Sequence, residues 1–469
     1  MVTDFFILLR QELVITAIIF LLLFVKLGKD RSNESILGWV NILLFLNFAY
    51  GFCCNTEGML FSEMFKTNPL IVLEKSILNL AIWLISLQSY SWLKTHKHVI
   101  EFYLLLLSTL LGMFFMISSG NLLMFYLGLE LSTIPLAAAV NFDLSRRQSS
   151  EAAMKMIISS AFSSALLLFG ISLVYGVSGT IVFSEMTAHV SSSPLYVFAF
   201  ILLLSAFAFK ISAVPFHLWT ADVYEGAPVA VTSYLSVVSK AAVLFVFVSV
   251  LYTVFKPMAD AWYNMLFILS LLTIVIGNLF ALRQNSFKRF LAFSSIAQVG
   301  FILVGISGSS QAGMASVIYF ILIYVFSNLA AFGVISLVSA VTGKENITDY
   351  KAFYTTNPLL TWILTIALFS LAGVPPTAGF FGKFFLLMAG AAKGNYWLIG
   401  IAALNMVVSF YYYLRVVKAM FMDSNEKPIE KLSIPAWSKL ALFICVIGII
   451  VTGLASCIYD YIFSLSSGF

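Results

Sequence analysis

Residues 209–244 read FKISAVPFHLWTADVYEGAPVAVTSYLSVVSKAAVL, and this stretch decides the fold. It is apolar enough to lie in a membrane, yet it carries Lys210 and Lys240 and is interrupted by Pro215. A charged side chain at the centre of a membrane helix costs about 2.5 to 3.5 kcal/mol unless it is paired or hydrated. Proline removes a backbone donor and disrupts the preceding turn. The stretch therefore predicts buried charge beside an interrupted membrane helix, which indicates an ion or proton pathway.

The same combination returns in SLAGVPPTAGFFGKF, residues 370–384, where Pro375 and Pro376 precede Lys383. Backbone groups freed by a break at membrane depth persist only where protein or water satisfies them. One break alone is equally compatible with a packing kink. Two breaks beside two lysines favour hydrated cavities at both places.

The composition places the chain among polytopic membrane proteins. Hydrophobic residues make up 61% of its 469 residues and charged residues only 10%. A soluble core of this size would need far more polar surface, whereas a bilayer requires apolar runs of about 20 residues. Fourteen such spans are expected, at residues 13–25, 36–54, 69–92, 99–116, 122–140, 152–175, 195–224, 229–254, 262–282, 290–305, 314–341, 359–392, 396–420 and 440–462.

The predicted fold class is all-α, with about fourteen transmembrane helices in a single membrane domain. AVPF at Ala213 resembles GVPP at Gly373, and the two breaks fall five helices apart, in the seventh and twelfth spans. Repeats with an odd number of helices lie inverted to each other. We therefore expect two inverted five-helix repeats, helices 4–8 and 9–13. The expected segments of the domain 1–469 are the N-terminal helices at 1–98, the repeats at 99–254 and 262–420, and a loop with the last helix at 421–469.

Basic residues segregate to one side of the membrane. Of the 26 Lys and Arg residues, 17 lie in loops that follow odd-numbered spans, four lie in the opposite loops, and five lie within spans. Cytoplasmic loops collect Lys and Arg. Both termini are therefore expected on the outer side.

Neither the cysteines nor the histidines have the spacing of a metal or redox centre. Cys53, Cys54, Cys445 and Cys457 show no paired CxxC arrangement, and the four histidines are mostly scattered. A haem, an iron–sulfur cluster or a zinc ion requires a denser set of ligands. We expect no redox centre in this chain and interpret the cysteines as small core residues.

Several motifs resemble those of a known family. They are GLELSTIPL from Gly128, EAAMKM from Glu151, KRFLAFSSIAQVGF from Lys288, and the two proline-containing stretches quoted above. Together they resemble the antiporter-like membrane subunits of bacterial NADH-quinone oxidoreductase (respiratory complex I) over nearly the whole chain. The N-type is favoured, because the L-type carries a long C-terminal lateral helix and the M-type usually has Glu where Lys383 stands.

The resemblance implies roles for four charged residues. Glu130 matches the family's fifth-helix glutamate, which pairs with the lysine of the broken helix, here Lys210. Lys240 matches the connecting lysine of the eighth helix, and Lys383 the terminal lysine of the second broken helix. A carboxylate favours the charged form of a nearby lysine. The separation of Glu130 and Lys210 is thus expected to control proton release towards Lys240 and Lys383.

Other positions are secondary. Lys155 matches a family position on the sixth helix, but it lies near the cytoplasmic end, where it could simply snorkel to water. His217 is either a bridge between the central lysines or a structural residue. Gln298 stands where some relatives have histidine, which puts a protonatable relay there in doubt. Glu74 and Lys75 are expected to form an interfacial pair with no transport role.

The resemblance also implies the assembly. NADH, FMN, iron–sulfur clusters and quinone would be bound by partner subunits, and quinone reduction there would supply the driving energy. The expected partners are M-type and small K-type and J-type subunits of the membrane arm and the lipid bilayer of the bacterial cytoplasmic (inner) membrane; no nucleic acid is expected. The chain itself would be one subunit of a translocase enzyme.

Three alternatives remain at this stage. A stand-alone or Mrp-type Na+(K+)/H+ antiporter subunit, or the membrane subunit of an energy-converting hydrogenase, would suit the same charges and breaks. Carboxylates favour hard cations, so one central glutamate against several lysines favours protons. A purely structural subunit would leave the central lysines unexplained.

Overall fold

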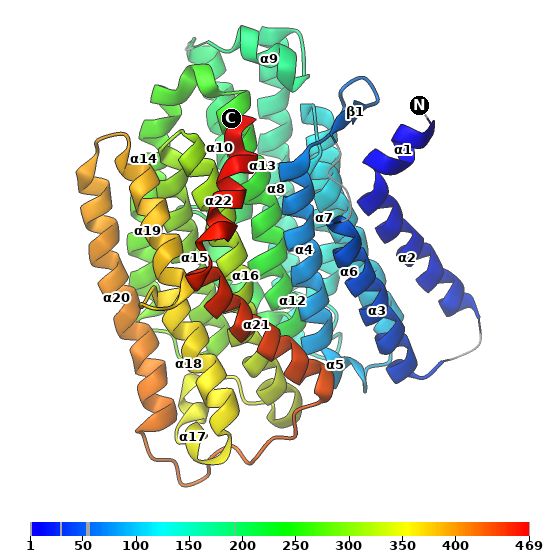
Figure 1. Ribbon diagram of the computed structural model, residues 1–469, viewed down its shortest axis with the longest axis vertical. Helices are drawn as coiled ribbons and strands as arrows, with labels where there is room; N and C mark the ends of the chain where they lie inside the picture. The colour runs from blue at the N-terminus through cyan, green and yellow to red at the C-terminus, as the bar shows by residue number, and fades with distance from the viewer. Residues whose placement is uncertain (1, 29–30, 53–56, 192, 469) are drawn as a thin grey trace.

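Long helices packed side by side make up most of the chain (Figure 1). The computed structural model describes residues 2–28, 31–52, 57–191 and 193–468. Within these residues the only strands form a short antiparallel hairpin, β1 (Gly58–Leu60) and β2 (Phe65–Thr67). The predicted all-α fold is confirmed.

Every expected span coincides with a helix or a broken pair of helices. Among the described residues, eleven helical runs are long and apolar enough to cross a membrane. They are α4 (Pro69–Gln88), α6 (Val99–Ile117), α7 (Leu122–Val140), α8 (Arg147–Ser178), α10 (Pro194–Ile211), the run α12 (Val229–Tyr234), η1 (Leu235–Ser239) and α13 (Lys240–Thr253), the run η2 (Lys256–Met258) and α14 (Ala259–Ala281), α15 (Phe287–Ser307), α16 (Gln311–Thr342), α20 (Tyr396–Phe421) and α21 (Ala436–Leu454).

The other three spans are helical as well. They correspond to α2 (Arg10–Leu27), α3 (Asn33–Gly51) and the broken pair α18 (Pro358–Ala372) and α19 (Ala378–Ala391). The remaining helices are short: α1 (Val2–Leu8), α5 (Tyr90–Leu93), α9 (Phe183–His189), α11 (Leu218–Gly226), η3 (Ile347–Tyr350), α17 (Phe353–Thr356), α22 (Ser456–Leu465) and η4 (Ser466–Gly468).

Local sequence signals define many helix ends. The side chains of Asn68 and Asn121 accept backbone hydrogen bonds at the starts of α4 and α7, as N-cap residues commonly do. Gly179 and Gly343 end α8 and α16 in the left-handed conformation, with φ of 71° and 67°. Glycine adopts this conformation without steric cost.

Close helix contacts recur in both predicted repeats. A Cβ atom on Gly112 of α6 would lie 2.5 Å from the backbone nitrogen of Ser132 in α7. A Cβ atom on Gly277 of α14 would lie 2.7 Å from the backbone nitrogen of Ala297 in α15. Small residues let membrane helices approach this closely. The first two helices of each repeat thus pack in the same way, which supports the duplication.

Both proline stretches interrupt their helices. After α10, Ser212 is left-handed with φ of 66° and the Val214–Pro215 bond is cis; after α18, Gly373 is left-handed with φ of 85° and the Pro375–Pro376 bond is cis. The Val214 N–H donates to Thr273 Oγ1 at 3.0 Å. Protein groups therefore satisfy backbone atoms at the break, as membrane depth requires.

Short elements mark the two ends of the bundle. The hairpin, α9 and the end of α22 lie at one end, the α9 face, whereas α5 and α17 lie at the other, the α17 face (Figure 1). Asp143 and Arg146, just before α8, line a cavity together with Trp92 of α5. The N-terminal end of α8 therefore lies at the α17 face.

Two expectations about single residues are wrong. Cys445 is buried in α21 as predicted, but Cys457 is exposed, because α22 buries only Ile462. Glu74 and Lys75 are not an interfacial pair, since each side chain is only 1% exposed and Lys75 pairs with Glu12 instead. Cys53 and Cys54 lie outside the described residues.

Candidate functional site

Glu130 and Lys210 meet at α8. Lys210 Nζ donates to Ser160 Oγ at 2.7 Å and to Thr133 Oγ1 at 2.9 Å. Glu130 accepts a hydrogen bond from Ser164. Ser160 and Ser164 are four residues apart and so share one face of α8. Within the described residues, no ion pair joins Glu130 to Lys210; each is hydrogen-bonded to a different serine of α8, and Lys210 also bonds Thr133, which follows Glu130 by three residues on α7.

Lys240 is buried in the centre of the bundle. Its Nζ donates to Ser295 Oγ on α15 at 2.7 Å and lies 5.4 Å from the centroid of the Tyr224 ring. The residues that immediately precede it form η1, a π-helical segment. Such segments often occur at functional sites, and the sequence did not indicate this one.

A polar cluster lies one turn before Lys240. Ser236 Oγ is 3.0 Å from the Tyr324 hydroxyl and accepts from Asn328 Nδ2 at 2.8 Å. Tyr324 and Asn328 belong to α16, so this cluster connects the helix of Lys240 to the second repeat. We did not predict these residues. A sequence signal for them does exist, because the polar side chains of Tyr324 and Asn328 are four residues apart inside an otherwise apolar span.

Lys383 is fully buried against the end of α18. Its Nζ donates to the carbonyl oxygens of Leu371 at 2.8 Å and Ala372 at 3.2 Å, and it lies 4.7 Å from the Phe301 ring centroid. A cation at the C-terminal end of a helix is stabilised by the helix dipole. The break thus creates the site that holds Lys383, because it ends α18 and frees these carbonyl groups.

Gln298 lies between the sites of Lys240 and Lys383. Its Nε2 donates to the Leu371 carbonyl at 2.8 Å and to the Tyr413 hydroxyl at 3.3 Å. It follows Ser295 by three residues and therefore lies on the same face of α15. Hydrogen-bonding groups thus extend from Lys240 through α15 to the carbonyl group that Lys383 also binds.

His217 lies beside an aromatic residue of α14. Neither ring nitrogen has a hydrogen-bond partner among the described residues. The ring centroid is 6.3 Å from that of Phe280 in α14. The structure therefore shows no hydrogen bond from His217 to Lys210 or Lys240, and its bridging role stays a prediction.

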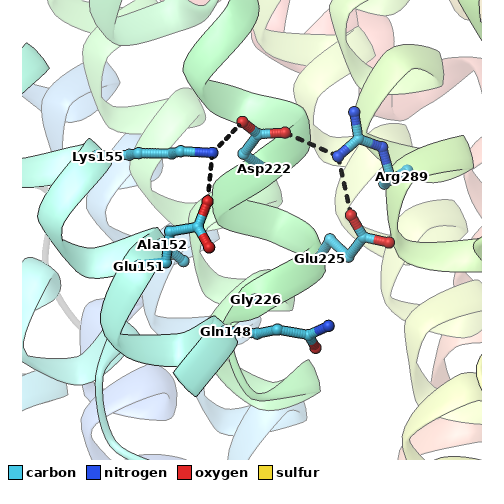
Figure 2. A pocket seen from close by; sticks show the side chains of 8 residues that line it. All are labelled: Gln148, Glu151, Ala152, Lys155, Asp222, Glu225, Gly226 and Arg289. Atoms are coloured by element: carbon cyan, nitrogen blue, oxygen red, sulfur yellow. Dashed lines mark hydrogen bonds and ion pairs between the residues drawn. The ribbon is translucent and has the colours of Figure 1, made fainter. Parts of the chain in front are cut away.

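Lys155 belongs to a charged pocket at the α17 face (Figure 2). Its Nζ lies 2.7 Å from Asp222 Oδ2 and 2.8 Å from Glu151 Oε1. Arg289 Nη1 lies 2.7 Å from Asp222 Oδ1 and 2.8 Å from Glu225 Oε2. These side chains come from α8, α11 and α15 and line a cavity of about 180 Å³. Lys155 is therefore part of a network of five charges.

Serines follow Lys155 along α8. Ser159 Oγ donates to the Lys155 carbonyl at 2.5 Å, and the adjacent Ser160 accepts from Lys210. The pattern ISSAFSSA, residues 158–165, repeats serine pairs at a spacing of four. This spacing places them along one helical face, and it is the signal by which sequence reasoning could have found them.

Comparisons with known proteins show which family the chain resembles. A family model described as NADH:quinone oxidoreductase/Mrp antiporter, TM, matches residues 119–409. The chain is 48% identical over 409 residues to NADH-quinone oxidoreductase subunit N of Phocaeicola vulgatus, covering 86% of each chain. It is 45% identical to subunit N of Azobacteroides pseudotrichonymphae, covering 99% of this chain and 98% of that one.

Solved structures with a similar fold include chains of two respiratory membrane complexes and of an Mrp complex from Dietzia. A chain of respiratory complex I from Thermus thermophilus with bound aureothin matches with a TM-score of 0.82 at 27% identity, covering 95% of this chain and 97% of that one. A chain of an archaeal membrane-bound sulfane sulfur reductase matches with a TM-score of 0.86 at 22% identity, covering 99% and 97%. The second likeness concerns the fold alone.

Proposed function

Since the chain belongs to the NADH:quinone oxidoreductase/Mrp antiporter membrane family, we propose that it translocates protons as the subunit N-type membrane component of an NADH-quinone oxidoreductase. Its relatives at 45% and 48% identity carry the name NADH-quinone oxidoreductase subunit N. The complex is the enzyme, and this chain is part of its membrane arm. Proton transfer is the task of this subunit.

The proposal rests mainly on the hydrogen-bond partners of Lys240 and Lys383. Among the described residues neither forms an ion pair, and each donates only to hydroxyl or carbonyl oxygens. A buried ammonium group without a counter-ion is costly. Without a counter-ion to fix the charged form, each side chain can exchange a proton, and a chain of such groups transfers protons without a metal ion.

The proposed route begins at the α17 face. Protons are taken up at the pocket of Lys155 and Asp222 and pass along the serines of α8 to Lys210. Release from Lys210 depends on Glu130, to which it is connected through α8. Lys240 accepts the proton next, by rearrangement of side chains and water in the bundle.

The second half of the route crosses α15. Ser295 binds Lys240, and Gln298 binds the Leu371 carbonyl that also holds Lys383. Gln298 does not titrate, so it positions hydrogen bonds while the lysines carry the proton. Lys383 then exchanges protons with the outer side or with a neighbouring channel.

The orientation and the assembly are part of the proposal. The α17 face is on the cytoplasmic side of a bacterial inner membrane and both termini are outside, as the distribution of Lys and Arg supports. Quinone reduction in partner subunits, which also hold NADH, FMN and the iron–sulfur clusters, drives transfer. The direct neighbours are M-type and small K-type and J-type membrane subunits.

The decisive experiment is the Lys210→Ala variant in the intact complex. Assembly is confirmed first, and quinone reduction and proton translocation are then measured in sealed membranes. We expect both to fall together, because Lys210 connects the uptake pocket to the central chain. Lys97→Ala is the matched control, since Lys97 is exposed. Full retention of both activities by Lys210→Ala would overturn the proposal.

A further inference from the structure

The first three spans hold buried charges that the proposed route does not use. Lys75 Nζ on α4 lies 2.5 Å from Glu12 Oε1 on α2, and the two side chains are 1% and 3% exposed. Lys75 Nζ also lies 5.0 Å from the Phe65 ring centroid and 5.9 Å from that of Phe114. The segment matched by the family model begins only at residue 119, so this cluster lies outside it.

Glu74 adds a second carboxyl group to the cluster. Its side chain is 1% exposed, and its Oε1 atom has no hydrogen-bond partner among the described residues. Glu12 Oε2 likewise has no hydrogen-bond partner among the described residues. An unsatisfied buried carboxylate oxygen is costly. Protonation of Glu74 removes the buried negative charge and so lowers this cost, which makes Glu74 a group that can hold a proton.

The cluster lies close to the α9 face. Glu74 follows Pro69, the first residue of α4, by five residues, which corresponds to about 7.5 Å along the helix. Leu70 and Ile71 precede Glu74 by four and three residues and so share its helical face. Both line a cavity of about 330 Å³ that reaches the exposed residue Ser184. Glu74 thus lies about one helical turn further into the bundle than Leu70 and Ile71, which form part of the cavity wall.

The opposite wall of this cavity belongs to the helix of Lys240. Val246, Ser249 and Val250 of α13 line it. α13 begins at Lys240, and Ser249 is nine residues further on, about 13.5 Å along the helix. The cavity therefore lies between the α9 face and the central lysine, with Glu74 on the neighbouring helix.

We propose that Glu74, with the Lys75–Glu12 pair beside it, is an outward proton-release site beneath this cavity. The inference rests on the proposed function and adds an exit for its protons. The Glu74 carboxylate accepts a proton from the central chain, whose donor becomes neutral, and the resulting carboxylic acid gives the proton to water in the cavity. The carboxylate is thereby regenerated, and no electrons are transferred. The buried side chains of the cluster are the cations Lys75 and Arg10 and the acids Glu12 and Glu74, so the cluster is neutral while Glu74 is ionised and carries one positive charge once Glu74 is protonated.

The test compares Glu74→Gln with Glu74→Asp in the intact complex. We expect Glu74→Gln to slow proton translocation in sealed membranes at least twofold and Glu74→Asp to retain most of the rate, because aspartate still titrates. Glu34→Gln is the control, since it removes a glutamate from an exposed pair with Lys94. An unchanged rate in Glu74→Gln, or equal losses in both Glu74 variants, would overturn the inference.

A second variant keeps the inference testable if the complex with Glu74→Gln does not assemble. Glu12→Gln combined with Lys75→Met removes one negative and one positive charge together, so the net charge of the cluster is unchanged, and we again expect slower translocation from an assembled complex. Normal translocation by this double variant would show that the cluster is structural. The Lys210→Ala experiment tests the proposed function separately: loss there, with normal rates in the Glu74 variants, refutes only the release site.

Discussion

Gln298 and Lys383 donate hydrogen bonds to the same atom, the carbonyl oxygen of Leu371, at 2.8 Å each. Leu371 is at the end of α18, where the helix break leaves carbonyl groups without intrahelical partners. One backbone group thereby connects α15 to the buried lysine of α19. The connection depends on an amide donor and does not require a titratable side chain at residue 298.

Replacement of Gln298 by leucine should slow proton translocation. One hydrogen bond is worth about 0.5 to 1.5 kcal/mol, so we expect a decrease of up to about tenfold, since 1.4 kcal/mol is a factor of ten. Gln298→His restores a donor and should retain most of the rate. The measurement is proton translocation driven by quinone reduction in sealed membranes. Equal rates in the leucine and histidine variants would contradict the role of Gln298.

The serines of α8 should matter for the first lysine. In the double variant Ser160→Ala with Ser164→Ala, Lys210 loses one acceptor and Glu130 loses its donor. We expect translocation to fall several-fold while the complex still assembles. Ser205→Ala is the control, because its hydroxyl bonds only within α10, to the Ile201 carbonyl. A loss of the same size in the control would indicate a general effect of removing hydroxyl groups.

Asp222→Asn should reduce proton translocation without reducing the stability of the complex. Asp222 contacts both Lys155 and Arg289, but these side chains are 35%, 44% and 29% exposed. Partly exposed ion pairs are worth about 1 kcal/mol or less, so thermal unfolding of the purified complex should change little. Proton translocation should nevertheless fall several-fold, because the variant removes a carboxylate from the uptake pocket. A clear drop in unfolding temperature with normal translocation would show that the network is structural.

Gly112→Val tests the helix packing on which the site depends. The first added carbon would lie 2.5 Å from the backbone nitrogen of Ser132, which cannot move away alone. Overpacking typically costs about 1 to 3 kcal/mol, so less assembled subunit should be found in membranes. Gly176→Val is the control, because nothing lies within 4 Å of a Cβ atom there. Normal amounts of the Gly112 variant would mean that α6 and α7 separate easily.

Much of the fold could be predicted from local properties of the chain. The apolar spans, the breaks at Pro215 and Pro376, and the buried lysines all follow from hydropathy and backbone chemistry. The predictions were wrong where the environment of a side chain depends on residues that are distant in the sequence. Cys457 is exposed because the adjacent helices fully bury only Ile462 of α22. Lys75 is paired with Glu12 rather than Glu74, because consecutive helical residues point in different directions.

The sequence by itself determined that this protein crosses the membrane many times and carries charge to its centre, because helix formation and transfer into lipid depend on each span separately. Only the tertiary structure decided the partners of those charges. Ser160 is 50 residues from Lys210, Ser295 is 55 from Lys240, and Glu12 is 63 from Lys75. Hydrogen bonds act over about 3 Å, so these contacts exist only once distant helices have packed together.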